Sequence, residues 1–245
     1  MHKLYDFIEA RERLTTVVVK TKLIHSPVFS EESGNEIYLK PENLQKTGSF
    51  KIRGAYNKIA KLTEEEKKKG VIASSAGNHA QGVAYAAKRL GIKAVIVMPK
   101  HTPLIKVEAT RKYGAEVVLY GEVYDDAYKK ALELQKENGY VFVHPFNDED
   151  VIEGQGTIAL EILDELPDAD IILVPLGGGG LVSGIASAAK LKNPQVKVIG
   201  VEPEGAASAI AALEKGKVVE LAEANTIADG TAVKRIGEKN FEYIK

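Results

Sequence analysis

The stretch KTGSFKIRGA, residues 46–55, places one lysine, Lys51, between small hydroxyl residues and the start of an apolar helical pattern. Phe50 and Ile52 flank this lysine, and burial beside them would lower its pKa, because desolvation penalises the charged amine. Only the neutral amine can form a Schiff base. The preceding residues 47–49 offer hydroxyl groups where a helix begins, which favours an anion there. From these residues alone, an ordinary solvated lysine in a helix-capping sequence remains the alternative.

Outward from this stretch, short apolar runs alternate with longer helical patterns. We expect strands at 36–40, 71–74, 94–98, 116–119, 141–143, 171–174 and 197–201. We expect helices at 4–14, 51–62, 79–90, 103–113, 125–137, 152–165, 180–191, 205–215 and 240–245, a loop at 21–29 and a solvated face at 64–69. This alternation predicts parallel βαβ units, and the uniformly apolar strands predict sheets covered on both faces. Ligands of such sheets bind beyond the carboxyl ends of the strands.

The loop after the strand at 71–74 is small and polar and opens a helix. It contains Ser75, Ala76, Gly77, Asn78 and His79. Backbone N–H groups at such a helix start can bind a carboxylate. Plain helix capping by Ser75 or Asn78 is the alternative.

Four successive glycines, residues 177–180, follow the strand at 171–174 and precede a helix. This run is costly in backbone entropy, and it is useful where the backbone must approach an anion closely. The alternative is a mobile turn. The loop lacks the Gly-Lys-Ser/Thr ending of a Walker loop and the context of a dinucleotide fingerprint.

Composition narrows the function. The chain has 245 residues, a formal charge of −1 and no cysteine. Disulfides, thiolate catalysis and cysteine-ligated metals are excluded, and nothing indicates a nucleic-acid or membrane partner. The polar start is not a signal peptide, so we expect a cytoplasmic protein. Abundant Lys and Glu suggest a thermophilic source.

The longer segment KPENLQKTGSFKIRGAYNKI, residues 40–59, resembles the cofactor-lysine segment of the serine/threonine dehydratases, which are pyridoxal-phosphate (PLP) enzymes of fold type II. The resemblance covers nearly the whole chain. It implies that Lys51 binds PLP covalently beside Phe50, and that Asn78 faces the 3′-oxygen of the cofactor. It also implies that residues 75–79 receive the substrate carboxylate. The phosphate would be held by Gly177, Gly178, Gly179, Gly180 and Leu181.

Other positions carry weaker implications. Gly230, within residues 226–235, is expected near the cofactor ring, and Asn147 is expected to line the substrate site. Glu202 matches a cation-binding glutamate of some relatives, but Ser208 stands where its partner acid would be, so we expect no metal. Residues 153–157 resemble a joint between domains, with simple packing as the alternative.

The implied fold is α/β, with two three-layer parallel-sheet domains. A small domain, 45–146, is inserted in a large PLP-binding domain, 1–44 and 147–245. Relatives continue beyond the residue matching Lys245, so the C-terminal part of the large domain, including the partner of the pyridine nitrogen, is expected to be absent here. The fragment itself could therefore be inactive. The full-length form is expected to be a homo-oligomer.

The implied reaction is β-elimination from an amino-acid substrate, in which Lys51 removes the Cα proton. Threonine would give 2-oxobutanoate and serine would give pyruvate, each with ammonia. Three alternatives remain open: a serine/threonine racemase, a β-replacement enzyme, and a non-catalytic relative. Ala76 stands where racemases of this family carry a serine, which disfavours the first. The catabolic or biosynthetic role is open.

Overall fold

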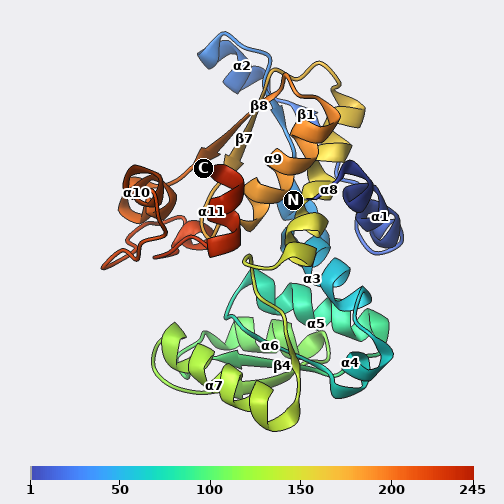
Figure 1. Ribbon diagram of the computed structural model, residues 1–245, viewed down its shortest axis with the longest axis vertical. Helices are drawn as coiled ribbons and strands as arrows, with labels where there is room; N and C mark the ends of the chain where they lie inside the picture. Colours follow the sequence, from blue (N-terminus) through green and yellow to red (C-terminus); the bar gives the residue numbers. More distant parts are fainter. Residues whose placement is uncertain (1) are drawn as a thin grey trace.

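The computed structural model describes residues 2–245, which form two lobes (Figure 1). The lower lobe is built on a parallel sheet of four strands in the order β5-β4-β3-β6. These are β3 (Val71–Ser74), β4 (Ala94–Met98), β5 (Glu116–Leu119) and β6 (Val141–Phe142). Strands β3 and β4 are buried along their whole length, as apolar strands between two helical layers must be. The expected parallel βαβ arrangement is confirmed.

Helices cover both faces of this sheet. On one face Val71, Ala73 and Ile96 pack with α3 (Lys51–Ala60), α5 (Asn78–Leu90) and α6 (Leu104–Lys112). On the other face Ile72 and Val95 pack with α7 (Tyr124–Asn138). The alternation of side chains along a strand therefore divides one apolar run between two cores.

The upper lobe has its own core around α8 (Glu149–Glu165) and α9 (Gly180–Lys192). Packed with them are α1 (Leu4–Leu14), β7 (Ile171–Pro175), β8 (Lys197–Val201), α10 (Ser208–Lys215) and α11 (Glu238–Ile244). The division into domains at residues 45 and 147 stays a prediction. None of the described helices is both long enough and apolar enough to cross a membrane.

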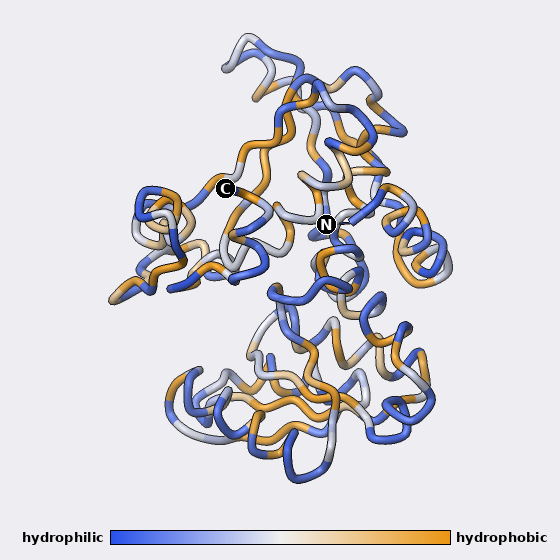
Figure 2. The backbone as a smooth tube through the Cα atoms, in the orientation of Figure 1, coloured by the Kyte–Doolittle hydropathy of each residue, from blue (hydrophilic) through white to orange (hydrophobic). Residues whose placement is uncertain are grey.

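The two-stranded parallel sheet of β7 and β8 differs from the expectation of sheets covered on both faces. One face, with Ile172 and Val174, packs into the upper core. On the other face, Ile171, Leu173 and Ile199 are 51%, 63% and 44% exposed. Both strands are largely hydrophobic (Figure 2). Their composition predicted burial, but no described element packs on this second face.

Smaller differences lie in the connections. The expected loop at 21–29 contains the start of α2 (Pro27–Ser33), because the Ser26 hydroxyl accepts from the N–H of Phe29 and proline suits the first helical turn. Short pieces complete the chain: β1 (Ile24–His25), β2 (Tyr38–Leu39), η1 (Glu42–Leu44), η2 (Lys46–Gly48), α4 (Glu64–Lys69), η3 (Glu204–Ala206) and η4 (Asp229–Thr231).

The lobes meet where α3 crosses α8. A Cβ added at Gly54 would lie 2.8 Å from the carbonyl oxygen of Val151, and one at Gly154 would lie 2.5 Å from the carbonyl oxygen of Arg53. Both glycines therefore permit two helix backbones to approach more closely than any side chain allows. This contact fixes the first turn of α3, which carries Lys51, against the upper lobe.

Candidate active site

Lys51 is the first residue of α3. This helix lies between the two lobes (Figure 1). Its Nζ donates to the carbonyl of Pro145 at 2.9 Å and lies 5.3 Å from the centre of the Phe50 ring. Burial lowers the pKa of Lys51 to about 8. The flanking residues predicted this burial. The lowered pKa raises the fraction of neutral amine, which is the nucleophilic and basic form, near neutral pH.

The turn before Lys51 has an unusual backbone. Thr47 has φ 66°, and among the described residues it is the one non-glycine residue with a positive φ. The left-handed region is unfavourable for a β-branched side chain, so the surrounding structure must hold this turn in place. The Thr47 hydroxyl is buried and makes no hydrogen bond to the described residues. Strain and an unpaired hydroxyl beside a reactive lysine indicate a functional site.

The loop at 75–79 reaches Lys51 through the helix that it opens. A Cβ added at Gly82 of α5 would lie 3.1 Å from the backbone of Lys51, so the two helix starts are in close contact. Ser75 Oγ accepts from the N–H of Gly77 at 3.2 Å, which shapes the turn. Ala76 is partly buried against the lower core. Asn78 is the first residue of α5.

The glycine loop is closely packed against neighbouring segments. A Cβ at Gly178 would lie 2.3 Å from the Phe146 ring, one at Gly180 2.9 Å from the Phe146 backbone, and one at Gly179 2.7 Å from Asn240. Gly179 also has φ 95°, which glycine tolerates best. The loop leads into α9, so its N–H groups lie at a helix start. These glycines thus have a packing reason as well as the predicted phosphate role.

One segment, residues 143–147, connects all three loops. Its Pro145 carbonyl binds Lys51, and its Val143 carbonyl lies 2.8 Å from Nε2 of His79. Phe146 packs on the glycine loop. Sequence reasoning missed this role of the segment, although it follows the carboxyl end of β6, where ligands of parallel sheets bind.

Two buried histidines here are neutral. Burial, followed by the nearby charge of Lys51, lowers the pKa of His79 to about 3. Burial also lowers the pKa of His144 to about 4. His144 Nδ1 accepts from the N–H groups of Phe146 and Asn147, and His79 Nε2 donates to a carbonyl. Both rings therefore serve as neutral hydrogen-bonding partners.

A buried ion network behind Lys51 was not predicted. Arg53 is fully buried and forms paired hydrogen bonds with Glu42, at 2.8 and 2.9 Å, and with Glu161, at 2.7 and 3.0 Å. Its Nη1 also donates to Thr157 at 3.2 Å. Lys40 completes the charge balance at 2.7 Å from Glu161. The network fixes α3 to α8 and η1, two residues from the reactive lysine.

The remaining predicted positions have other partners. Asn147 Oδ1 accepts from the N–H of Lys239 at 2.9 Å and so binds the start of α11. Gly230 has no described atom near the position of an added Cβ, but its neighbour Thr231 lies against Gly177. Glu202 accepts from the N–H groups of Ala209 and Ile210 at 2.9 and 3.0 Å, so its carboxylate caps α10. The substrate and cofactor roles of Asn147 and Gly230 stay predictions.

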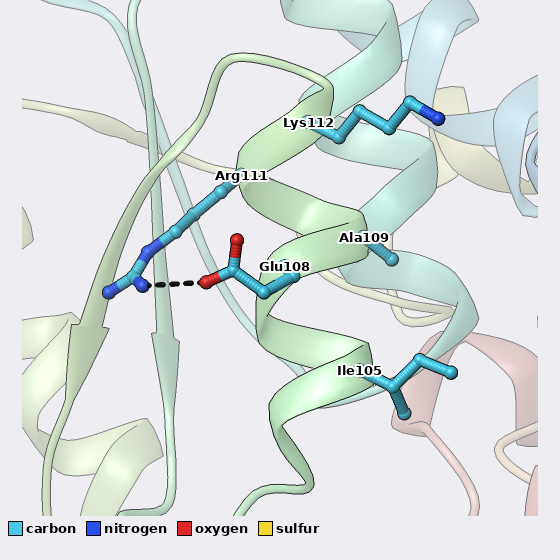
Figure 3. A pocket seen from close by; sticks show the side chains of 5 residues that line it. All are labelled: Ile105, Glu108, Ala109, Arg111 and Lys112. Atoms are coloured by element: carbon cyan, nitrogen blue, oxygen red, sulfur yellow. Dashed lines mark hydrogen bonds and ion pairs between the residues drawn. The ribbon is translucent and has the colours of Figure 1, made fainter.

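A hollow of about 610 Å³ lies away from these loops, on α6 (Figure 3). Glu108 and Arg111 pair at 3.0 Å on one side of the helix, while Ile105, Ala109 and Lys112 point to the other. All of its lining residues belong to α6, so the candidate site remains the one around Lys51.

Known proteins resemble this chain over nearly its whole length. A family model described as "Pyridoxal-phosphate dependent enzyme" matches residues 14–245. The chain is 57% identical over its whole length to an L-threonine ammonia-lyase of Thermotoga maritima and spans 61% of that relative. Among solved structures, the processed threonine deaminase isoform 2 of Solanum lycopersicum has a TM-score of 0.94 and 45% identity, over 98% of this chain and 71% of that one. Maize serine racemase has a TM-score of 0.95 and 38% identity, over 98% and 73%.

Proposed function

Because this chain belongs to the family of pyridoxal-phosphate dependent enzymes, as the resemblance of residues 40–59 implied, we propose that the protein is an L-threonine and L-serine ammonia-lyase. It removes the α-amino group and the β-hydroxyl and yields a 2-oxo acid and ammonia. The observation that carries the proposal is Lys51, with its lowered pKa, held between the three loops described above. The names of relatives at 48–57% identity supply the substrate class.

The residues around Lys51 fit the cofactor. The amine can reach its neutral form, and the glycine loop ends at a helix start suited to a phosphate. Buried hydroxyls of Thr47 and Ser74 and the Asn240 side-chain oxygen have no hydrogen-bond partner among residues 2–245. A polar group bound beside the turn before Lys51 would satisfy the Thr47 hydroxyl.

When bound, PLP supplies the electron sink that stabilises negative charge at Cα. The chain supplies the rest. Lys51 attaches the cofactor and takes the Cα proton, for which a pKa of about 8 is well suited. The N–H groups of residues 177–181 would hold the phosphate, the loop at 75–79 would receive the substrate carboxylate, and Asn78 would help to hold the cofactor. The β-hydroxyl leaves as water, and water later releases ammonia, so the reaction needs no oxidant.

Mass spectrometry tests the attachment. The chain is incubated with PLP, reduced with borohydride and digested, and the mass added by the cofactor is expected on Lys51. A Lys51→Ala variant should take up none. Label on another lysine would overturn the assignment. In the full-length protein, L-threonine should yield 2-oxobutanoate.

A cytoplasmic location, a homo-oligomeric full-length form and a thermophilic source are further proposals. Composition supports the first and the third, since the chain has no cysteine and is rich in Lys and Glu.

A serine or threonine racemase is the second candidate, favoured by the similarity to maize serine racemase. Racemisation needs proton donors on both faces of the Cα carbanion, and Ala76 offers only a methyl group. His79 is a poor substitute, because its Nε2 is bonded to Val143 and its pKa is about 3.

Elimination should therefore dominate in the full-length protein, and Ala76→Ser should raise the ratio of racemisation to elimination. A positioned proton donor contributes about a hundred- to ten-thousand-fold, so the change should be measurable by chiral chromatography of the products. Ala76→Gly, which also lacks a donor, is the matched control. Fast interconversion of serine enantiomers by the unaltered protein would count against the ammonia-lyase.

A further inference from the structure

A largely buried histidine side chain near the N-terminus lies among three carboxylates, away from Lys51. His2 packs edge-on against Phe7 and is stacked on Tyr243, with ring centres 5.3 and 5.7 Å apart. Its side chain is only 7% exposed. Nearby are Asp6 on α1 and Glu153 on α8. His2, Asp6 and Glu153 each offer one ligand atom, and these three atoms lie within 4.8 Å of one another. No other such group of three occurs among residues 2–245.

The imidazole of His2 has unused hydrogen-bonding capacity. Nδ1 lies 3.5 Å from Glu153 Oε1 and 3.9 Å from Asp6 Oδ2, which is too far for hydrogen bonds. Nε2 lies 2.9 Å from Glu149 Oε2 but makes no hydrogen bond to any described residue, because the ring is out of line. Buried polar groups are almost always satisfied, so a further partner is expected here.

We propose that His2 Nδ1, Asp6 Oδ2 and Glu153 Oε1 bind a divalent first-row transition ion such as Zn²⁺. Metal–ligand bonds of about 2.0–2.1 Å place neighbouring ligands about 3.3 Å apart in a tetrahedron. The observed separations of 3.5 and 3.9 Å are close to that value and require only small movements. A nitrogen and two carboxylate oxygens suit zinc better than calcium or magnesium, which prefer oxygen ligands alone.

Other side chains are placed to orient the proposed ligands His2 and Glu153. Glu153 Oε2 accepts from Lys61 Nζ at 2.8 Å and from Asn57 Nδ2 at 3.0 Å, which leaves Oε1 for the ion. Glu149 lies beside Nε2, where a carboxylate orients a metal-bound histidine in many proteins. Tyr243 Oη donates to Glu149 Oε2 at 2.7 Å and holds that carboxylate.

The ion would have a structural role. Its ligands come from the N-terminal segment and α8, and through Glu149 and Tyr243 they reach α11. Helix α11 in turn contacts the glycine loop through Asn240, whose Nδ2 donates to the Gly178 carbonyl at 2.8 Å. The site is therefore expected to stabilise the fold without touching a substrate.

Calorimetric titration of the 245-residue chain, stripped with chelator and free of PLP, with zinc chloride tests the proposal. We expect one ion per chain. His2→Ala and Glu153→Gln should each weaken binding at least tenfold, and Glu149→Gln should weaken it about ten- to hundredfold. His25→Ala is the matched control, because His25 lies 3.1 Å from Glu36 on the surface without a third ligand among the described residues. That variant should bind as the unaltered chain does.

Four results would overturn the proposal. The first is no binding at a large molar excess of zinc. The second is unchanged affinity in both Asp6→Asn and Glu153→Gln, which would indicate chelation by His2 and the terminal amine alone. The third, which holds even where a variant fails to fold, is an X-ray absorption spectrum of the zinc-bound chain with more than one imidazole ligand. A loss of thermal stability in His2→Ala that is the same with and without zinc would mean that His2 acts only as an ion-pairing residue.

Discussion

At the scale of single residues, Lys51 shows how far local sequence can predict chemistry. Its apolar neighbours indicated burial, and burial is the cause of its lowered pKa. Arg53, two positions later, gave no such signal, because its partners Glu42 and Glu161 are 11 and 108 positions away in the chain. A buried arginine is indistinguishable in the sequence from a solvated one on a lysine-rich helix.

The pKa of Lys51 predicts a pH dependence. Below pH 8 each unit should lower the neutral fraction of the amine about tenfold, and the rate of PLP uptake should fall in parallel. Above pH 8 the rate should level off. Stopped-flow absorbance of the cofactor on the chain measures this. A rate that still rose between pH 9 and 10.5 would show that Lys51 keeps an ordinary pKa.

The same shift has a consequence for stability. Between pH 8 and the unfolded value near 10.5, the unfolded chain binds more protons at Lys51 than the folded chain. The contribution of Lys51 to the free energy of unfolding without PLP should therefore rise with pH in that window. Lys51→Met should remove this rise, which urea unfolding at several pH values would detect.

The Arg53 network predicts a loss of stability on a small change. Arg53→Lys keeps the charge but cannot form two paired sets of hydrogen bonds with Glu42 and Glu161. Incompletely compensated buried carboxylates should lower the free energy of unfolding by about 3 kcal/mol. Arg11→Lys is the control, since Arg11 pairs with Asp164 at the surface and should change stability by less than about 1 kcal/mol. Equal effects of both changes would contradict a special role for the network.

At the scale of elements, the strands and helices of the lower lobe were predictable, because their apolar patterns are long and regular. The expected ranges 71–74, 94–98 and 116–119 match β3, β4 and β5. The expected loop at 21–29 overlaps the first turn of α2, a short helix that has no buried residue and depends on a cap. The partner of the glycine loop could not be predicted either, because Phe146 lies more than thirty positions before it.

That contact leaves no room for a side chain at Gly178, because any Cβ at this position meets the Phe146 ring at 2.3 Å. Gly178→Ala should therefore lower both thermal stability and PLP affinity. When Phe146 is also changed to Ala, the Gly178→Ala change should cost less thermal stability than it does in the unaltered chain. If the loop binds the phosphate, fluorescence titration should still show weak PLP binding in the double variant. Recovery of both properties would limit Gly178 to packing.

At the scale of the whole molecule, the open face of β7 and β8 is the main departure from a covered α/β fold. The exposed face carries Ile171, Leu173, Ile199 and Val201, and Ile210 and Leu213 of α10 are also exposed. The apolar pattern predicted both strands and their burial. It could not predict that no described element would cover this face, because a strand pattern specifies a face and not its partner. The chain spans 61% of the length of its Thermotoga maritima relative.

An exposed apolar face of this kind predicts concentration-dependent association of the 245-residue chain. Leu173 and Ile199 are register partners across the two strands. The double variant Leu173→Lys with Ile199→Glu places opposite charges side by side, which should keep the strand pairing while removing apolar surface. Sedimentation velocity should show larger species for the unaltered chain and a monomer for the variant.

Ile172→Lys is the matched control, because Ile172 lies on the opposite face of β7 and is 7% exposed. Burying a lysine in the upper core should unfold that lobe and increase association, which circular dichroism and sedimentation would show together. An unaltered chain that stays monomeric at millimolar concentration would contradict the prediction. So would a double variant, Leu173→Lys with Ile199→Glu, that associates as strongly as the parent, because association would then arise from another surface.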